Sequence, residues 1–100
     1  MAEAITKTVD KQDTEILKPR KYKVIVLNDD KTPMEFVIAM FMKVFKHSIG
    51  LSEQLTMKIH NEGSAVAGIY SYEIAEQKTV EATNMAREHN FPLILKVESE

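Results

Sequence analysis

The sequence predicts an α+β domain, in which a small three-stranded antiparallel sheet packs against three helices in the order β-α-α-β-α-β. Three short runs of apolar residues, each bounded by turn residues, are typical of strands. The longer segments place apolar residues at intervals of three and four, which is typical of helices. With six such elements in 100 residues, we expect one domain with its helices on one face of the sheet, rather than a doubly wound parallel architecture.

The composition is that of an ordinary globular domain, with 44% hydrophobic and 28% charged residues. A net charge of -2 with interleaved signs lacks the basic excess of nucleic-acid binders, so we expect no nucleic-acid partner. Cysteine is absent, which excludes disulfide scaffolds, thiolate zinc sites and a cysteine nucleophile. Neither a signal-like segment nor a run of 18 apolar residues occurs, so we expect a cytoplasmic protein without a membrane partner.

Residues 1–20 are expected to form a flexible N-terminal tail, and residues 21–100 the folded core. The tail alternates charges and Thr with isolated aliphatic residues and keeps neither a helical nor a strand period. The first strand is expected at Tyr22–Leu27, where Tyr22, Val24 and Val26 point to one side.

The first helix is expected to begin at Pro33. Thr32 and Glu35 have the spacing of a capping box, and proline is favoured at the first helical position. Gly50 is a plausible end for this helix. Its apolar residues follow the helical spacing, and they are Phe36, Val37, Met40, Phe41, Val44 and Phe45.

A second, shorter helix is expected to be capped by Ser52 and to end at Gly63, which can adopt the left-handed conformation. Leu55 and Ile59 would share one face of this helix, and His60 would lie in its last turn. The second strand is expected at 64–70.

Ser71 is expected to cap a third helix over Tyr72–His89, which Asn90 would end. The last strand is expected at Leu93–Val97. The apolar stripe of the third helix is narrow and consists of Ile74, Ala75, Ala82, Met85 and Ala86.

Asn28-Asp29-Asp30 follows the first strand and is the main candidate for chemistry. From the residues alone a polar turn is favoured, because Asn and Asp side chains bond to nearby backbone. If Thr32 caps the helix, however, two adjacent carboxylates exceed what the turn needs. The segment does not have the alternating acidic positions of a calcium-binding loop, which disfavours a metal site. The sequence has no nucleophile motif, which disfavours a catalytic pair. His60 beside Ile59 could lie at the rim of an apolar depression.

Four segments of the sequence resemble the ClpS adaptor family, from about Tyr22 to the C-terminus. They are "YKVIVLNDDKTPMEFV", "IH" with a glycine three residues after its histidine, "GIYSYEIAEQK" and "AREHNFPL". The resemblance implies the small α+β fold and a non-enzymatic adaptor. Such adaptors bind proteins through a free N-terminal Leu, Phe, Tyr or Trp and deliver them to a ClpA-type AAA+ unfoldase, whose partner peptidase is ClpP.

The resemblance also implies roles for individual residues. Separately, no cofactor or metal is expected, and a monomer is the default expectation. The substrate's α-amino group would be bound by Asn28, Asp29 and His60. The peptide and the loop would be held by Asp30 and Thr32. The side-chain pocket would be lined by Met34, Val37, Met40, Thr56, Ile59 and Leu93. Met34 would exclude β-branched residues, and Thr56 stands where the family commonly has Met. The unfoldase would contact Glu73 and Lys78.

Elementary energetics agree with a site that joins polar and apolar recognition. An α-amino group has a pKa of about 7.7–8.0, so it is mostly a cation with three donors at neutral pH. Burial of a Leu or Phe side chain contributes roughly 1.5–3 kcal/mol, whereas micromolar binding requires about 8 kcal/mol. Two alternatives stay open at this point: a general protein-interaction or ribosome-associated module, and a metal-dependent hydrolase using Asp29, Asp30 and His60.

Overall fold

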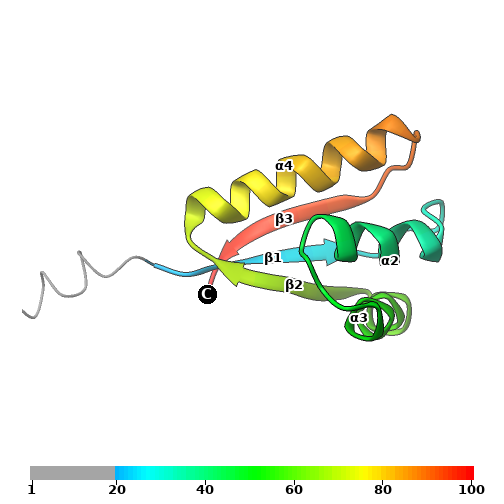
Figure 1. Cartoon of the computed structure of the whole chain (residues 1–100), viewed down its shortest axis with the longest axis horizontal. Coiled ribbons are helices and arrows are strands. Elements are labelled where there is room, and N and C mark those ends of the chain that lie inside the picture. The colour runs from blue at the N-terminus through cyan, green and yellow to red at the C-terminus, as the bar shows by residue number, and fades with distance from the viewer. Residues whose placement is uncertain (1–19) are drawn as a thin grey trace, which may run out of the picture.

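The computed structural model describes residues 20–100 and has the predicted order of elements (Figure 1). The elements are β1 (Tyr22–Leu27), α2 (Met34–Lys43), α3 (Ile49–Glu62), β2 (Ser64–Tyr70), α4 (Tyr72–Glu88) and β3 (Ile94–Ser99). The predicted α+β fold class is therefore confirmed. The predicted tail lies, except for its last residue, outside the described residues.

β1 is the central strand of the sheet, which has the order β2-β1-β3 with both pairs antiparallel. Figure 1 shows α4 running along the sheet, while α2 and α3 gather at the end where β1 stops and β2 begins. Val24 and Val26 of β1 are fully buried, whereas Val66 and Ile69 of β2 are exposed. The helices therefore cover one face of the sheet and leave the other uncovered.

Alanines let α4 lie close to the sheet. Ala75, Ala82 and Ala86 are fully buried, as the predicted stripe requires. Ile74 was expected in this stripe but is 42% exposed. Neighbouring residues of a helix point about 100° apart. Ile74 therefore points away from the narrow buried stripe that contains Ala75.

The first helix begins at Met34 rather than at Pro33, and it begins without the predicted capping box. Pro33 is the N-cap residue of α2, with an extended backbone (φ -66°, ψ 146°) and no side-chain cap hydrogen bond. The Thr32 hydroxyl donates instead to the carboxylate of Asp29. The capping box therefore does not form, because Asp29 captures the side chain that would make it.

The boundary between the first two helices also differs from the prediction. α2 already ends at Lys43, and Lys46 has a left-handed backbone (φ 60°) that prevents the helix from continuing. Gly50 thus lies in the first turn of α3 and not at the end of α2. Ser48, rather than Ser52, caps α3, since its Oγ accepts the N–H of Leu51 at 3.2 Å. Ser52 lies inside the helix and is fully buried.

The other two predicted helix ends are confirmed. Gly63 ends α3 with a φ of 96°, and Asn90 follows α4 with a φ of 62°. After Asn90, the N–H of Phe91 bonds to the carbonyl of Ala86 at 2.9 Å, as in a Schellman motif. Both turns direct the chain towards the same end of the sheet.

Replacing Gly63 tests the requirement for a left-handed residue at the end of α3. Gly63→Ala should lower the free energy of unfolding by about 1–2 kcal/mol, because a Cβ disfavours this conformation. No atom lies within 4 Å of the added Cβ, so a clash does not contribute. The measurement is urea unfolding followed by circular dichroism.

Gly50→Ala is the matched control. It also adds a methyl group with no atom within 4 Å, but at a helical position without positive φ. We expect it to be neutral or to stabilise by up to about 1 kcal/mol. Equal losses in both variants would contradict the role assigned to Gly63.

Candidate functional site

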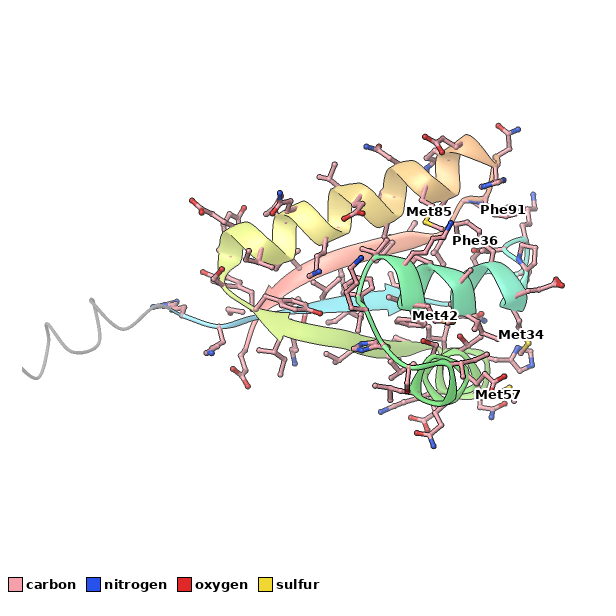
Figure 2. The ribbon with its side chains drawn as sticks, in the orientation of Figure 1. Met34, Phe36, Met42, Met57, Met85 and Phe91 are labelled. Carbon is pink, nitrogen blue, oxygen red and sulfur yellow. The ribbon has the colours of Figure 1, made fainter. Side chains whose placement is uncertain are left out.

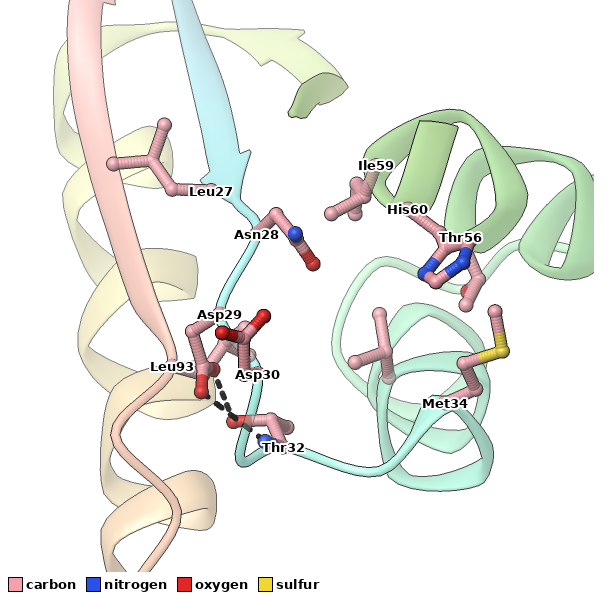
Figure 3. Close-up of a pocket in the computed structure, with 11 residues that line it drawn as sticks. Leu27, Asn28, Asp29, Asp30, Thr32, Met34, Thr56, Ile59, His60 and Leu93 are labelled. Atoms are coloured by element: carbon pink, nitrogen blue, oxygen red, sulfur yellow. Dashed lines mark hydrogen bonds between the residues drawn. The ribbon is translucent and has the colours of Figure 1, made fainter. Parts of the chain in front are cut away.

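A cavity of about 250 Å³ opens at the end of the sheet, between the loop after β1, the helices α2 and α3, and the residue that precedes β3 (Figure 3). Segments distant in sequence contribute to it. Its lining residues are Leu27, Asn28, Asp29, Asp30, Thr32, Met34, Val37, Thr56, Ile59, His60 and Leu93. All but one of the residues predicted for the amino-group site, the loop and the pocket are therefore adjacent.

The exception is Met40, which was predicted to line the pocket. Its side chain is fully buried in the core and does not line the cavity. Met40 lies about one turn after Val37 along α2, beyond the residues that reach the opening. Leu27 lines the cavity but was not predicted, because its position at the end of a strand gives no signal of its own.

One backbone hydrogen bond joins the two polar sides of the cavity. The N–H of Asn28, directly after β1, donates to the carbonyl of Gly63 at the end of α3, with an N···O distance of 2.9 Å. This bond brings Asn28 close to the last turn of α3, which carries His60. In Figure 3 the Asn28 amide points from the loop into the space in front of α3.

The carboxylate of Asp29 holds the loop in a closed turn. Its Oδ1 accepts the backbone N–H groups of Lys31 and Thr32 at 2.7 and 3.1 Å, and its Oδ2 accepts the Thr32 hydroxyl (Figure 3). A carboxylate offers roughly four acceptor directions. One direction on Oδ2 therefore stays available at the edge of the cavity.

The polar side of the cavity is rich in acceptors. The Asn28 carbonyl, the carboxylates of Asp29 and Asp30, and the His60 imidazole all border it. These groups suit a small cation with several N–H donors. Over residues 20–100, no three His, Asp or Glu side chains gather into a group that could hold a metal ion. The hydrolase alternative thus lacks its ligand set in this part of the chain.

The opposite side of the cavity is apolar and firmly supported. Val37, Ile59 and Leu93 are buried, and Met34 stands exposed at the opening. Arg87 Nη1 donates to the Leu93 carbonyl at 2.9 Å, which fixes that wall.

Aromatic packing links this wall to α2. Phe36 in the first turn of α2 meets Phe91, before β3, with ring centroids 5.0 Å apart, and both are labelled in Figure 2. The two walls that carry Val37 and Leu93 are therefore held together by a direct contact.

Glu73 and Lys78, predicted to contact the unfoldase, do not lie on one patch. Glu73 lines a shallow groove on α4 with Tyr72, Glu76, Gln77 and Val80. In this groove a hydrogen bond to Glu76, together with its negative charge, raises the pKa of Tyr72.

Lys78 is directed away from this groove. Its Nζ donates to the carbonyl of Val44 at 2.9 Å and lies 5.4 Å from the centroid of the Tyr70 ring. Burial raises the pKa of Tyr70. Lys78 therefore joins α4 to the end of α2, whatever else it contacts.

Comparisons with known proteins agree with the geometry. The family model described as ATP-dependent Clp protease adaptor protein ClpS matches residues 17–96. A protein named ATP-dependent Clp protease adapter protein ClpS from Pectobacterium carotovorum is 42% identical over 91 residues, which cover 91% of this chain and 86% of that protein. One of the same name from Campylobacter jejuni is 43% identical over 94 residues, which cover 94% and 98%.

A solved structure is similar over most of the chain. It is that of Agrobacterium tumefaciens ClpS2 bound to L-phenylalaninamide, at 43% identity and a TM-score of 0.80. The match covers 82% of this chain and 99% of that chain. At this identity the likeness extends beyond the fold to the residues.

Substitution of Lys78 tests its contribution to the fold. Lys78→Met keeps the aliphatic stem but removes the donor to Val44, so we expect a loss of about 1–2 kcal/mol in the free energy of unfolding. Glu73→Gln on the exposed groove should change this free energy by less than about 0.5 kcal/mol. Both are measured by urea denaturation, and equal stability of the two variants would contradict the structural role of Lys78.

Proposed function

The chain belongs to the ClpS family of ATP-dependent Clp protease adaptors and is an adaptor rather than an enzyme, and from this premise we propose how it selects its substrates. It binds proteins through a free N-terminal Leu, Phe, Tyr or Trp and delivers them, as a monomer in the cytoplasm, to a ClpA-type AAA+ unfoldase. The observation that carries this proposal is that one cavity combines polar acceptors on one side with apolar walls on the other.

The acceptor side fits the substrate's α-amino group. This group is mostly a cation at neutral pH and has three donors. Asn28 offers a carbonyl oxygen, Asp29 offers its remaining acceptor direction, and His60 offers an imidazole nitrogen as an acceptor. Asp30 and Thr32 support the peptide and the loop. Each charge-assisted hydrogen bond contributes roughly 1.5–3 kcal/mol, which adds to the apolar contribution.

The apolar side fits the side chain of the same residue. Val37, Ile59 and Leu93 would surround it, and Met34 at the opening would exclude side chains that branch at Cβ. L-phenylalaninamide, which the Agrobacterium tumefaciens protein binds, combines a free α-amino group, an aromatic side chain and an amide in place of the carboxylate. It has the chemistry of an N-terminal Phe residue, and this supports the proposal.

The surface around Glu73 is the proposed contact with the unfoldase. Its groove is exposed and acidic and lies on α4, away from the cavity. A substrate in the cavity therefore leaves this groove free. Lys78 would contribute by holding α4 against α2, in addition to any contact of its own.

A fluorescence-anisotropy series with short peptides tests the substrate proposal. A Leu-initiated peptide should bind in the micromolar range or tighter, whereas its acetylated form should bind at least about 100-fold more weakly, because two charge-assisted bonds are lost. An Ile-initiated peptide should also bind weakly.

The controls separate the rival functions. A chelator should leave binding of the Leu-initiated peptide unchanged, whereas a metal-dependent hydrolase would lose activity. Equal affinity for the free and the acetylated peptide would contradict the proposal and favour a general protein-interaction module.

Replacement of His60 tests its role as an acceptor. His60→Ala should weaken binding of a Phe-initiated peptide by at least about tenfold, because one charge-assisted hydrogen bond to the amino group is lost. The measurement is fluorescence anisotropy at one fixed pH.

His60→Gln is the matched variant. Glutamine keeps a carbonyl acceptor, so this variant should retain more of the affinity than His60→Ala. Equal losses in the two variants would contradict the acceptor role of His60.

A further inference from the structure

Two buried hydroxyl groups lie on the face of α3 that borders the cavity. Thr56 lines the cavity and is 3% exposed, and Ser52 is fully buried one turn earlier. Residues four apart share one face of a helix, so Ser52, Thr56 and His60 form a row. Of this row, Thr56 and His60 line the cavity, so the cavity has the Thr56 hydroxyl at its side towards the start of α3.

The hydrogen bonds of this pair leave acceptor and donor capacity unused. Thr56 Oγ1 donates to the carbonyl of Ser52 at 2.7 Å, which uses its proton but not all of its lone pairs. Ser52 Oγ has no partner within the described part of the chain. A buried hydroxyl without a partner normally carries a penalty, so its presence in a folded domain calls for an explanation.

The row of residues lies along the path of a bound side chain. If the α-amino group is held by Asn28 and His60, the side chain extends from His60 towards Thr56. These two residues are four positions apart, which corresponds to roughly 6 Å along the helix axis. That span suits an aromatic ring and its para substituent, whereas a Leu side chain is too short to reach Thr56. In Figure 3 the Thr56 oxygen lies on the side of α3 that faces Met34.

We propose that Thr56 determines specificity by accepting a hydrogen bond from the hydroxyl of an N-terminal Tyr. This inference rests on the proposed function and refines it. Thr56 Oγ1 has already given its proton to Ser52, so the phenolic O–H is the donor. Ser52 does not line the cavity; it acts through its carbonyl, which takes the Thr56 proton and leaves Thr56 Oγ1 as an acceptor.

The consequence is a preference for Tyr over Phe. In a wholly apolar cavity the phenolic O–H would lose its hydrogen bond to water and receive nothing in return. With an acceptor at the end of the cavity this penalty is removed. Phe instead leaves the Thr56 lone pairs dehydrated and unpaired, which disfavours it relative to Tyr.

The test compares Tyr-, Phe- and Leu-initiated peptides by fluorescence anisotropy. The unmodified chain should bind the Tyr peptide at least as tightly as the Phe peptide. Thr56→Val has nearly the same shape but no hydroxyl, so it should raise the Kd for Tyr about fivefold or more. It should not raise the Kd for Phe, and should lower it to the extent that the unpaired hydroxyl disfavours Phe. Thr56→Ser keeps the hydroxyl and should retain the preference for Tyr.

Thr79→Val is the matched control. Thr79 Oγ1 is the other buried side-chain oxygen without a partner in residues 20–100, and it lies on α4 outside the cavity lining. Its removal should leave the ratio of the Tyr and Phe affinities unchanged.

The outcomes distinguish this inference from the proposed function. If Thr56→Val binds Tyr and Phe in the same ratio as the unmodified chain, the role of Thr56 is refuted while the proposed function stands. If the unmodified chain does not distinguish free from acetylated peptides, the proposed function fails and this inference falls with it. Selective loss of Tyr affinity in Thr56→Val, restored in Thr56→Ser, supports both.

Discussion

The site depends first on the carboxylate of Asp29, which folds the loop between β1 and α2. By accepting two backbone N–H groups and the Thr32 hydroxyl, it closes a turn that no regular element would fix. The turn sets where α2 begins and thereby where Met34 and Val37 meet the cavity. It also leaves Asn28 at the mouth of the cavity, so one side chain positions both the polar and the apolar parts of the site.

Helix ends supply the remaining constraints. Gly63 turns α3 back into β2, and its carbonyl receives the N–H of Asn28. Arg87, in the last turn of α4, bonds to the carbonyls of Phe91 and Leu93. Each wall is therefore fixed through backbone atoms, which are less mobile than side chains. A site organised in this way before binding loses little conformational entropy when a ligand enters.

The fold could be predicted because alternating and helical spacings are local, and the residues that end α3 and α4 have distinctive backbone preferences. The start of α2 could not, because Thr32 can either cap a helix or bond to Asp29, and the sequence allows both. The start of α3 could not be predicted for a similar reason, because both Ser48 and Ser52 are residues that can cap a helix. Grouping Asn28, His60 and Leu93 needed a family resemblance, since no period links such distant positions. Met40 lies on the same helix face as Val37, so the helical spacing does not separate the two. Only the packing shows that Met40 belongs to the core and does not line the cavity.

The double role of Asp29 affects how its replacement would be interpreted. A loss of binding in an Asp29 variant would combine a missing acceptor with a loosened loop, and the two effects are not additive because they share one side chain. His60 differs, because among the residues lining the cavity the hydrogen bonds join Asp29 and Thr32 and leave the imidazole free. Its substitution therefore reports on recognition more directly. On the polar side of the cavity, Asp29 thus holds the loop in its closed turn, whereas His60 stabilises no part of the loop and is available for recognition alone.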